Sequence, residues 1–265
     1  MTMSAVSSYL EPLRTIARQA GDAIMAIYSQ DFNVIEKDDS SPLTQADLAA
    51  HKVICESLAQ LTPEIPVLSE ESESIEWRVR QSWETFWLVD PLDGTKEFIK
   101  KNGEFTVNIA LVHHGKPVCA VVYAPVLDKM YSAVNDGHQR KAWVAKEEQD
   151  ATLLSVDTTI DDVVKVVGSR SHPSPALSDF LTRYHQAELV PVGSSLKFCL
   201  VAEGLAHVYP RLGPTSEWDT AAGHCVVEAA GGIVLTVDHQ PLLYNQSESI
   251  RNPFFYVSAS MSLID

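Results

Sequence analysis

The stretch Phe86-Trp87-Leu88-Val89-Asp90-Pro91-Leu92-Asp93 joins an apolar run to an acidic turn. The run predicts a short buried strand that ends in an acid, and strand ends are where α/β proteins assemble their sites. Pro91 fixes its own backbone φ angle and the following glycine permits a tight approach, so Asp90 and Asp93 can converge while the Leu92 carbonyl points inward. This stretch therefore predicts a strand that delivers two carboxylates and one carbonyl to the same place.

The two residues after this turn, Gly94 and Thr95, open a predicted short helix over residues 95–101. Its free N–H groups would face an anion such as phosphate. Metal ions next to a helix N-terminus are an arrangement suited to phosphoryl transfer. Taken alone, Asp-Pro-x-Asp-Gly is better explained as a simple turn.

Two further segments concentrate acids where a predicted strand stops, and these favour a site over a simple turn. They are Leu68-Ser69-Glu70-Glu71 and Glu217-Trp218-Asp219. Carboxylates gathered without lysine or arginine between them repel one another and call for a cation. Oxygen ligands of this kind select Mg²⁺, Mn²⁺ or Ca²⁺ over zinc or copper.

The spacing of Asp90 and Asp93 argues against two other phosphate or metal motifs. An EF-hand loop needs acids at alternate positions before its glycine. Phosphatases that form an aspartyl-phosphate carry Asp-x-Asp-Gly-Thr, which has one residue fewer between the acids than this chain. The spacing therefore favours direct attack by water at a metal site.

Working outward, the hydrophobic pattern predicts an alternation of helices and strands. We expect helices over residues 10–27, 44–61, 176–184, 195–202 and 218–230, and strands over 66–69, 86–89, 105–112, 118–123, 129–133, 163–167 and 189–192. Thr44 is the expected N-cap of the second helix, with Asp47 at the capping-box position. The charged stretch 136–150 is the best candidate for a surface excursion near a domain boundary. This pattern predicts an α/β protein with two sub-domains.

The composition bounds the class of partner. The chain has 35 Asp and Glu against 20 Lys and Arg, a net charge of −15, which disfavours binding to nucleic acid or anionic membranes. Its apolar runs are too short to cross a bilayer as a helix, and its N-terminus is unlike a signal peptide. The four cysteines are far apart and lack zinc or redox spacing, so we expect reduced thiols and a cytoplasmic protein.

Three segments resemble the signatures of the inositol monophosphatase superfamily of lithium-sensitive phosphatases. They are Glu70-Glu71, Asp90-Pro91-Leu92-Asp93-Gly94-Thr95 and Trp218-Asp219-Thr220-Ala221-Ala222-Gly223, and the resemblance covers nearly the whole chain. Residues 94–98, 168–172 and 193–198 are similar to the bacterial 3′(2′),5′-bisphosphate nucleotidase branch of the CysQ type. The inositol branch usually has Thr-Asn where this chain has Lys96-Glu97, which argues against inositol phosphate specificity.

This resemblance implies a layered αβαβα sandwich, an α/β (α+β layered) fold with the site between two sub-domains. The N-terminal sub-domain, residues 1–150, would carry most metal ligands. The C-terminal sub-domain, residues 151–265, would carry Asp219 and the residues that bind substrate.

The resemblance also implies how the acids divide between two metal ions. Glu70, Asp90 and the carbonyl of Leu92 would hold the ion beside the attacking water. Asp90, Asp93 and Asp219 would hold a second ion next to the leaving oxygen. Two or three Mg²⁺ ions are expected, with Mn²⁺ as a substitute and Li⁺ as an inhibitor.

Asp47 and Thr95 would form the catalytic pair that orients and deprotonates the water. From the residues alone, Asp47 is better explained as a helix cap, and only the resemblance gives it a catalytic role. The N–H groups of Gly94 and Thr95 would bind the phosphate being removed. Glu71 matches the family pattern as well, as a residue behind the ligands or a ligand of a third ion.

A second phosphate on the substrate requires positive charge or N–H donors. Lys197 follows Ser194 and Ser195 in a small-residue turn that enters a helix, and Arg211 lies between two prolines. His172 would contact the ribose, base or phosphate. For each single Lys, Arg or His, a solvated surface charge is the competing explanation. The full expected substrate-binding set is Glu70, Leu92, Asp93, Gly94, Thr95, His172, Ser194, Ser195, Lys197, Arg211 and Asp219.

The resemblance implies a magnesium-dependent phosphatase that converts adenosine 3′,5′-bisphosphate to AMP and phosphate. It also allows 3′-phosphoadenosine 5′-phosphosulfate as a substrate, with a role in sulfur assimilation or nucleotide recycling. The expected partner is a small nucleotide bisphosphate, and some relatives associate with the cytoplasmic face of the inner membrane. Two alternatives stay open at this point: an inositol or sugar phosphatase with the same metal chemistry, and a metal-sensing binding protein that is not an enzyme.

Overall fold

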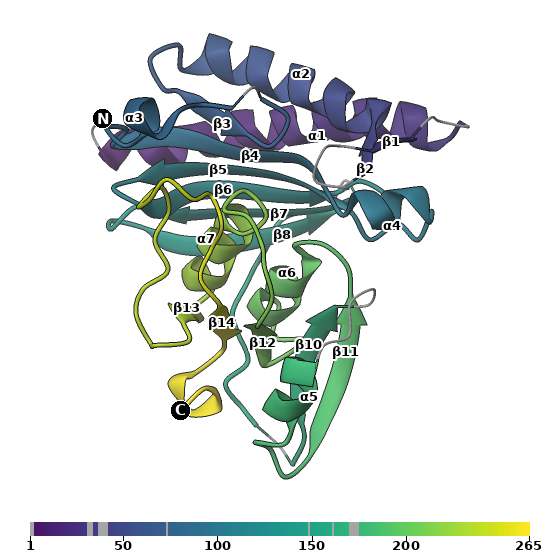
Figure 1. Cartoon of the computed structure of the whole chain (residues 1–265), viewed down its shortest axis with the longest axis vertical. Helices are drawn as coiled ribbons and strands as arrows, with labels where there is room; N and C mark the ends of the chain where they lie inside the picture. Colours follow the sequence, from purple (N-terminus) through teal and green to yellow (C-terminus); the bar gives the residue numbers. More distant parts are fainter. Residues whose placement is uncertain are drawn as a thin grey trace.

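Helices and sheets alternate in five layers, αβαβα, in the computed structural model of the protein (Figure 1). The structure describes residues 3–30, 34–36, 42–72, 74–147, 149–160, 162–169 and 175–265. The predicted layered α/β fold is confirmed.

The first sheet has seven strands in the order β3-β4-β5-β6-β7-β8-β9. They are β3 (Val67–Ser69), β4 (Thr85–Asp93), β5 (Thr106–His113), β6 (Lys116–Ala124), β7 (Lys129–Asn135), β8 (Arg140–Lys146) and β9 (Thr152–Leu153). Strands β3 and β4 run parallel, and the other neighbours are antiparallel. The register of β4 against β5 shifts between Asp90 and Asp93, where Pro91 cannot donate to the ladder.

The outer face of this sheet is covered by α1 (Leu10–Tyr28) and α2 (Gln45–Leu61), which pack on each other and on strands β4 to β7. A 3₁₀ helix, η1 (Met3–Tyr9), leads into α1, and a short pair of strands, β1 (Val34–Glu36) and β2 (Pro42–Thr44), leads into α2. Helix α2 begins with the predicted capping box between Thr44 and Asp47. These helices bury one apolar face against alternate residues of the strands.

The inner face of the first sheet packs on α6 (Leu196–Ala202) and α7 (Ala221–Ala229). The same helices contact the second sheet on their other side. One hydrophobic cluster therefore runs from Leu88 and Ala110 of the first sheet, through Phe198 and Val226, to Val257 of the second. The site lies at the edge of this shared core, where α6 and α7 begin.

The second sheet has five strands in the order β11-β10-β12-β14-β13. They are β10 (Val164–Ser169), β11 (Ala187–Val192), β12 (Val208–Arg211), β13 (Ile233–Thr236) and β14 (Phe255–Ser258). Helix α5 (Pro175–Leu181) and the 3₁₀ helix η2 (Met261–Leu263) lie on the outer side, where Phe180 and Leu263 enter a small apolar cluster with Val166 and Tyr256. A one-turn helix, α3 (Trp77–Arg80), and the short α4 (Thr95–Ile99) flank β4 along the chain.

Two expectations from the sequence are wrong in detail. Residues 136–150 were expected to form a surface excursion, but they contain β8, because Ala142 and its neighbours pair along β7 despite the charges at both ends. The last long helix begins at Ala221 rather than Trp218, because residues 217–220 form a turn whose carbonyls accept the first N–H groups of the helix. The free thiols are confirmed: Cys119, Cys199 and Cys225 are buried and Cys55 is partly buried.

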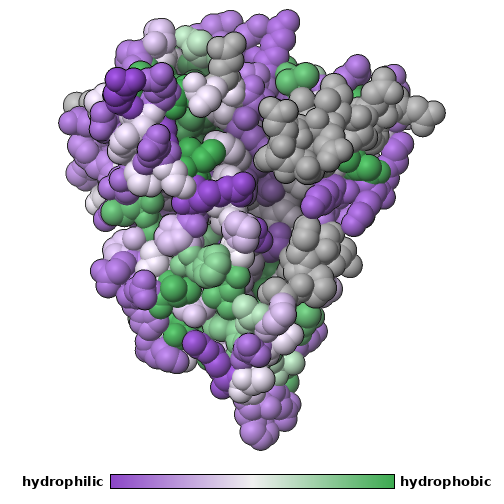
Figure 2. Space-filling view, in the orientation of Figure 1, coloured by the Kyte–Doolittle hydropathy of each residue, from purple (hydrophilic) through white to green (hydrophobic). Residues whose placement is uncertain are grey.

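The face seen in Figure 2 is hydrophilic over most of the first-sheet half, with hydrophobic patches gathered over the lower half. Among the described residues, no helix is both long and apolar enough to cross a membrane.

Candidate active site

Strand β4, which lies between β3 and β5, carries Asp90 and Asp93 at its C-terminal end. The Asp90 carboxylate is 1% exposed, and its Oδ1 accepts a hydrogen bond from the backbone N–H of Leu92 at 3.0 Å. Leu92 is itself buried, and its carbonyl lies 3.5 Å from Oγ1 of Thr95. Gly94 has a φ of 91°, a left-handed conformation that lets the chain turn directly from β4 into α4.

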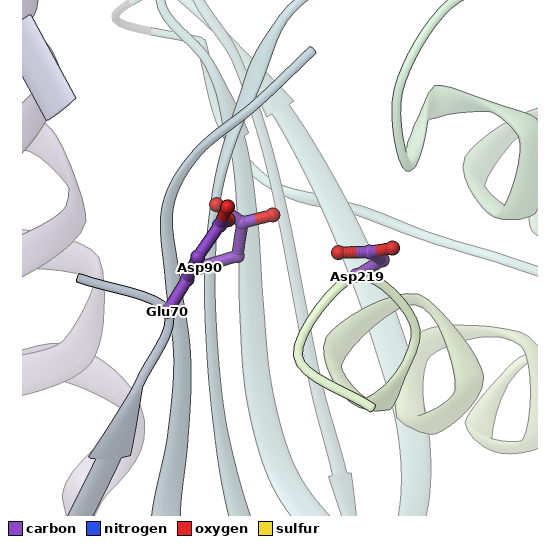
Figure 3. Close-up of side chains that lie close together, drawn as sticks. All are labelled: Glu70, Asp90 and Asp219. Carbon is purple, nitrogen blue, oxygen red and sulfur yellow. The ribbon is translucent and has the colours of Figure 1, made fainter. Parts of the chain in front are cut away.

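Glu70, Asp90 and Asp219 form a compact group of acids (Figure 3). Each offers a carboxylate oxygen, and these oxygens all lie within 4.8 Å of one another. Glu70 follows β3, which is parallel to β4, so its side chain points toward Asp90 from the neighbouring strand end. Asp219 approaches from the opposite side, on the turn before α7.

The turn that holds Asp219 is fixed by its own side chain. Its Oδ2 accepts hydrogen bonds from Oγ1 of Thr215 at 2.6 Å and from the backbone N–H of Ser216 at 2.9 Å. A carboxylate oxygen of the same residue lies within 4.8 Å of those of Glu70 and Asp90. Asp219 therefore stabilises its turn and contributes to the acidic group at the same time.

Asp47 divides its two oxygens between two tasks. Oδ2 accepts from the backbone N–H of Thr44 at 2.8 Å and from the Thr44 hydroxyl at 2.6 Å, completing the capping box of α2. Oδ1 lies 3.3 Å from the Thr95 hydroxyl, which donates to it. The cap explanation is confirmed, and the same carboxylate is also paired with Thr95 as the catalytic expectation requires.

Burial and mutual repulsion raise the pKa of Asp90 and Asp93. The pKa of Asp90 lies well above its ordinary value because the group is buried and because Glu70, Asp93 and Asp219 are close. Burial and Asp219 raise the pKa of Asp93 to about 6, against the attraction of Lys197 and a hydrogen bond from Ser195. Burial also raises the pKa of Asp47. A bound cation would stabilise the ionised form of these acids at neutral pH.

The donors present fit a hard divalent cation. Glu70, Asp90 and Asp219 supply carboxylate oxygens at a spacing that a single ion can bridge, and the described residues of this group include no thiolate or imidazole. Asp93 lies beside the group, close enough for its charge to act on Asp90 and for the charge of Asp219 to act on Asp93. A cleft of about 800 Å³ is lined by Glu70 and by Trp218, the residue before Asp219.

The loop between β11 and α6 brings Ser194 and Ser195 to the acids, and the first turn of α6 brings Lys197. The Ser195 hydroxyl lies 2.8 Å from Oδ2 of Asp93, so it is in hydrogen-bond contact with one of the acids. The Lys197 ammonium donates to the Ser194 carbonyl at 2.8 Å, and the residue is only 7% exposed. Burial lowers the pKa of Lys197 to about 8, against the attraction of Asp93.

Arg211 ends β12 close to Lys197, near enough for the two charges to repel. Its NH2 group donates to the Pro214 carbonyl, while its buried Nε has no hydrogen-bond partner among the described residues. The buried hydroxyl of Ser194 is unpartnered in the same sense. His172 lies outside the described residues.

Two residues near the acids were not singled out from the sequence. Asn108 of β5 donates from Nδ2 to Ser195 Oγ at 2.9 Å, and His51, one turn after Asp47 on α2, lies 2.9 Å through Nδ1 from Ser69 Oγ. Asn108 carries a detectable signal, since it is a lone amide in the apolar run 105–112. His51 carries only its i, i+4 spacing from Asp47.

Comparison with known proteins gives one consistent result. The profile of the inositol monophosphatase family matches residues 5–259. The chain is 52% identical over 251 residues to the 3′(2′),5′-bisphosphate nucleotidase CysQ of Escherichia coli O6:H1, covering 94% of this chain and 99% of that protein. The crystal structure of CysQ from Bacteroides thetaiotaomicron has a TM-score of 0.82 at 42% identity, covering 96% of this chain and 98% of that one. An inositol monophosphatase from Anabaena sp. PCC 7120, at 24% identity, shares the fold with a TM-score of 0.74, covering 97% of this chain and 93% of that one.

Proposed function

The chain belongs to the inositol monophosphatase family, and from that premise we propose that it is a magnesium-dependent 3′(2′),5′-bisphosphate nucleotidase. Its substrate would be adenosine 3′,5′-bisphosphate, from which it removes the 3′-phosphate to give AMP. The observation that carries this proposal is the pairing of two features: a compact acidic group and, beside it, a buried lysine and an arginine. The first suits the phosphate that is cleaved, and the second suits a phosphate that is retained.

Glu70, Asp90, the Leu92 carbonyl, Asp93 and Asp219 would hold the metal ions in the proposed enzyme. A divalent cation at this position neutralises phosphate charge, lowers the pKa of water and stabilises the leaving alkoxide. The compact group of Glu70, Asp90 and Asp219 supports this assignment most directly. We assign Asp93 to the second ion because its charge lies next to Asp90 and Asp219.

Asp47 and Thr95 would move the proton in this reaction. The Thr95 hydroxyl donates to Oδ1 of Asp47, which frees its lone pairs to accept a hydrogen bond from the attacking water. When water attacks phosphorus, its proton would pass to the Thr95 hydroxyl as the hydroxyl proton moves to Oδ1 of Asp47. The bond from phosphorus to the 3′-oxygen would break, and that oxygen would take a proton from water to become the 3′-hydroxyl of AMP. The capping box keeps Oδ2 occupied, so Oδ1 is the atom available for the exchange.

The retained 5′-phosphate would bind near Lys197, Arg211 and Ser194. The unpartnered Nε of Arg211 and hydroxyl of Ser194 are buried groups that an anion would satisfy. The N–H groups of Gly94 and Thr95 would meet the phosphate being removed. We keep Ser195 and His172 in the proposed substrate-binding set, and His172 there rests on sequence similarity alone.

Phosphate release from a panel of substrates tests this proposal. We expect adenosine 3′,5′-bisphosphate to have a kcat/KM at least about 100-fold above inositol 1-phosphate, with activity lost on chelation of Mg²⁺ and reduced by Li⁺. Lys197→Met should raise KM for the bisphosphate by about 10-fold or more, with a smaller effect on a nucleoside monophosphate. A clear preference for inositol 1-phosphate, or equal effects on both nucleotides, would contradict the substrate assignment.

Further parts of the proposal need separate tests. Hydrolysis of 3′-phosphoadenosine 5′-phosphosulfate belongs in the same panel, and sulfate-limited growth of a deletion strain would test a role in sulfur assimilation. We propose the cytoplasm as its location, with fractionation to detect any attachment to the inner membrane. We also propose the division at residues 1–150 and 151–265 as the boundary of two units, to be tested by limited proteolysis.

A further inference from the structure

Asn108 is a polar residue on an apolar face of β5. Ala110 and Val112, on the same face, belong to the core shared with α6 and α7, and Asn108 is only 1% exposed. Its Cα partner on β4 is Asp90, and directly opposite residues of an antiparallel pair place their side chains on the same face of a sheet. A buried amide is costly unless it is hydrogen-bonded, so its partners indicate its task.

The amide of Asn108 donates from Nδ2 to the Ser195 hydroxyl at 2.9 Å. Ser195 Oγ also lies 2.8 Å from Oδ2 of Asp93 and 2.7 Å from the backbone carbonyl of Asp219. A carboxylate and a carbonyl can only accept, and the hydroxyl has a single proton. Because Asn108 donates, the proton of Ser195 is committed to the side of the two acids.

We propose that Asn108 is a positioning residue for the acidic group and that it acts through Ser195. Asp93 stands on the first sheet, whereas Ser195 and Asp219 belong to the layer of α6 and α7. The Ser195 hydroxyl joins them, so the direction in which its proton points fixes Asp93 against the turn of Asp219. Asn108 sets that direction.

The neighbouring residue Thr106 extends this polar strip. Thr106 is opposite Asp93 in the β4–β5 register, as Asn108 is opposite Asp90. Its hydroxyl and Oδ1 of Asn108 are buried and have no hydrogen-bond partner among the described residues. The inner face of β5 is thus polar only where it runs beside the acids of β4, which ties Asn108 to the site rather than to sheet packing.

The inference rests on one part of the proposed function, namely that these acids bind Mg²⁺. A double-mutant cycle on the Kd for Mg²⁺ tests it. Full-length wild type, Asn108→Leu, Ser195→Ala and the double variant are titrated with MgCl₂ by calorimetry, without nucleotide. We expect each single variant to raise the Kd for Mg²⁺ by about 10-fold and the double variant to be no weaker than the weaker single one. An unchanged Kd in Asn108→Leu, or effects that multiply in the double variant, would overturn the proposal.

Two additional variants separate positioning from loss of stability. Asn108→Ala is used if the leucine side chain does not fit at this position, and we expect it to raise the Kd for Mg²⁺ by the same factor. Asn135→Leu is the matched control, because Asn135 also donates across layers, to Oε2 of Glu228 at 3.0 Å, but at the far end of β7. It should lower Tm and leave the Kd unchanged; a rise equal to that of Asn108→Leu would refute a specific role for Asn108. If the Kd values follow the expected pattern but the protein hydrolyses no bisphosphate, the proposed substrate is refuted and the positioning role of Asn108 still holds.

Discussion

Asp90 and Asp219 offer oxygens to the same space, but they reach it from two different kinds of structure. Asp90 is fixed by a strand in the middle of a hydrogen-bonded ladder, with β3 on one side and β5 on the other. Asp219 sits on a turn that its own carboxylate stabilises through Thr215 and Ser216. The first position is set by neighbours far away along the chain, and the second by residues within four positions.

This difference shows how the chain fixes two carboxylates close together although their charges repel. The sheet side holds Asp90 almost fully buried, where its charge is costly because burial and Glu70 both raise its pKa. The turn side lets Asp219 keep two donors of its own, so its charge is partly satisfied before any ion binds. A cation then completes the contact between the two layers.

The largest effect should come from removing a charge on either side. We expect Asp90→Asn and Asp219→Asn each to lower kcat by about 1,000-fold or more, because both remove a negative ligand from the metal site. Metal-free Asp90→Asn should unfold at a higher temperature than wild type at pH 8, since a repelled buried carboxylate is gone. Asp219→Asn should not gain stability, because its carboxylate already has donors. Calorimetric Tm values with EDTA, beside kcat values, check both; equal gains in Tm would erase the distinction.

The two oxygens of Asp47, on helix α2, allow a second test. Thr95→Val removes the donor to Oδ1 and should lower kcat by about 100-fold, with little change in Tm. Thr44→Val removes the hydroxyl on Oδ2 and should lower stability by about 1 kcal/mol while leaving most of kcat. Urea unfolding and initial rates on the same preparations separate the effects. If Thr44→Val lowers kcat as much as Thr95→Val, the division of tasks is wrong.

Removing the metal should have an effect that grows with pH. The pKa of Asp93 is about 6 in the folded protein, above its ordinary value near 4, so its protonated form favours folding. That contribution is complete below about pH 4 and is lost as the pH rises through about 6. Saturating Mg²⁺ should therefore raise Tm by roughly 5–10 °C at pH 8 and by less at pH 5. Asp93→Asn is the control, since it should reduce the difference between the two pH values.

The smallest expected effect lies on the turn side. Thr215→Val removes one donor to Asp219 and leaves the backbone donor of Ser216 in place. We expect the Kd for Mg²⁺ to rise by a few-fold, up to about 10-fold, with kcat at saturating Mg²⁺ within about 3-fold of wild type. Mg²⁺ titrations of initial rate check this. A loss of kcat as large as that of Asp219→Asn would show that the turn depends on Thr215 alone.

Local signals in the sequence were sufficient for much of the fold and for the acids. The capping box at Thr44, the apolar run before Asp90 and the three acidic segments are short-range patterns, and the structure has each of them. The β8 strand escaped prediction because its pairing with β7 outweighs the charges at its ends. The dual use of Asp47 and the contact of Asn108 with Ser195 depend on residues 48 and 87 positions away, which no local pattern reports.

The position of α6 and α7 between the two sheets has a consequence for how the enzyme can be divided. Phe198 and Val226 belong to a core that also contains residues of both sheets, so neither half has a complete interior of its own. A fragment ending near residue 153 would present the inner face of its sheet, including Ala110 and Val112, to water. If one half is exchanged with that of a relative, we therefore expect a folded protein only when the residues on both faces of α6 and α7 are exchanged as well.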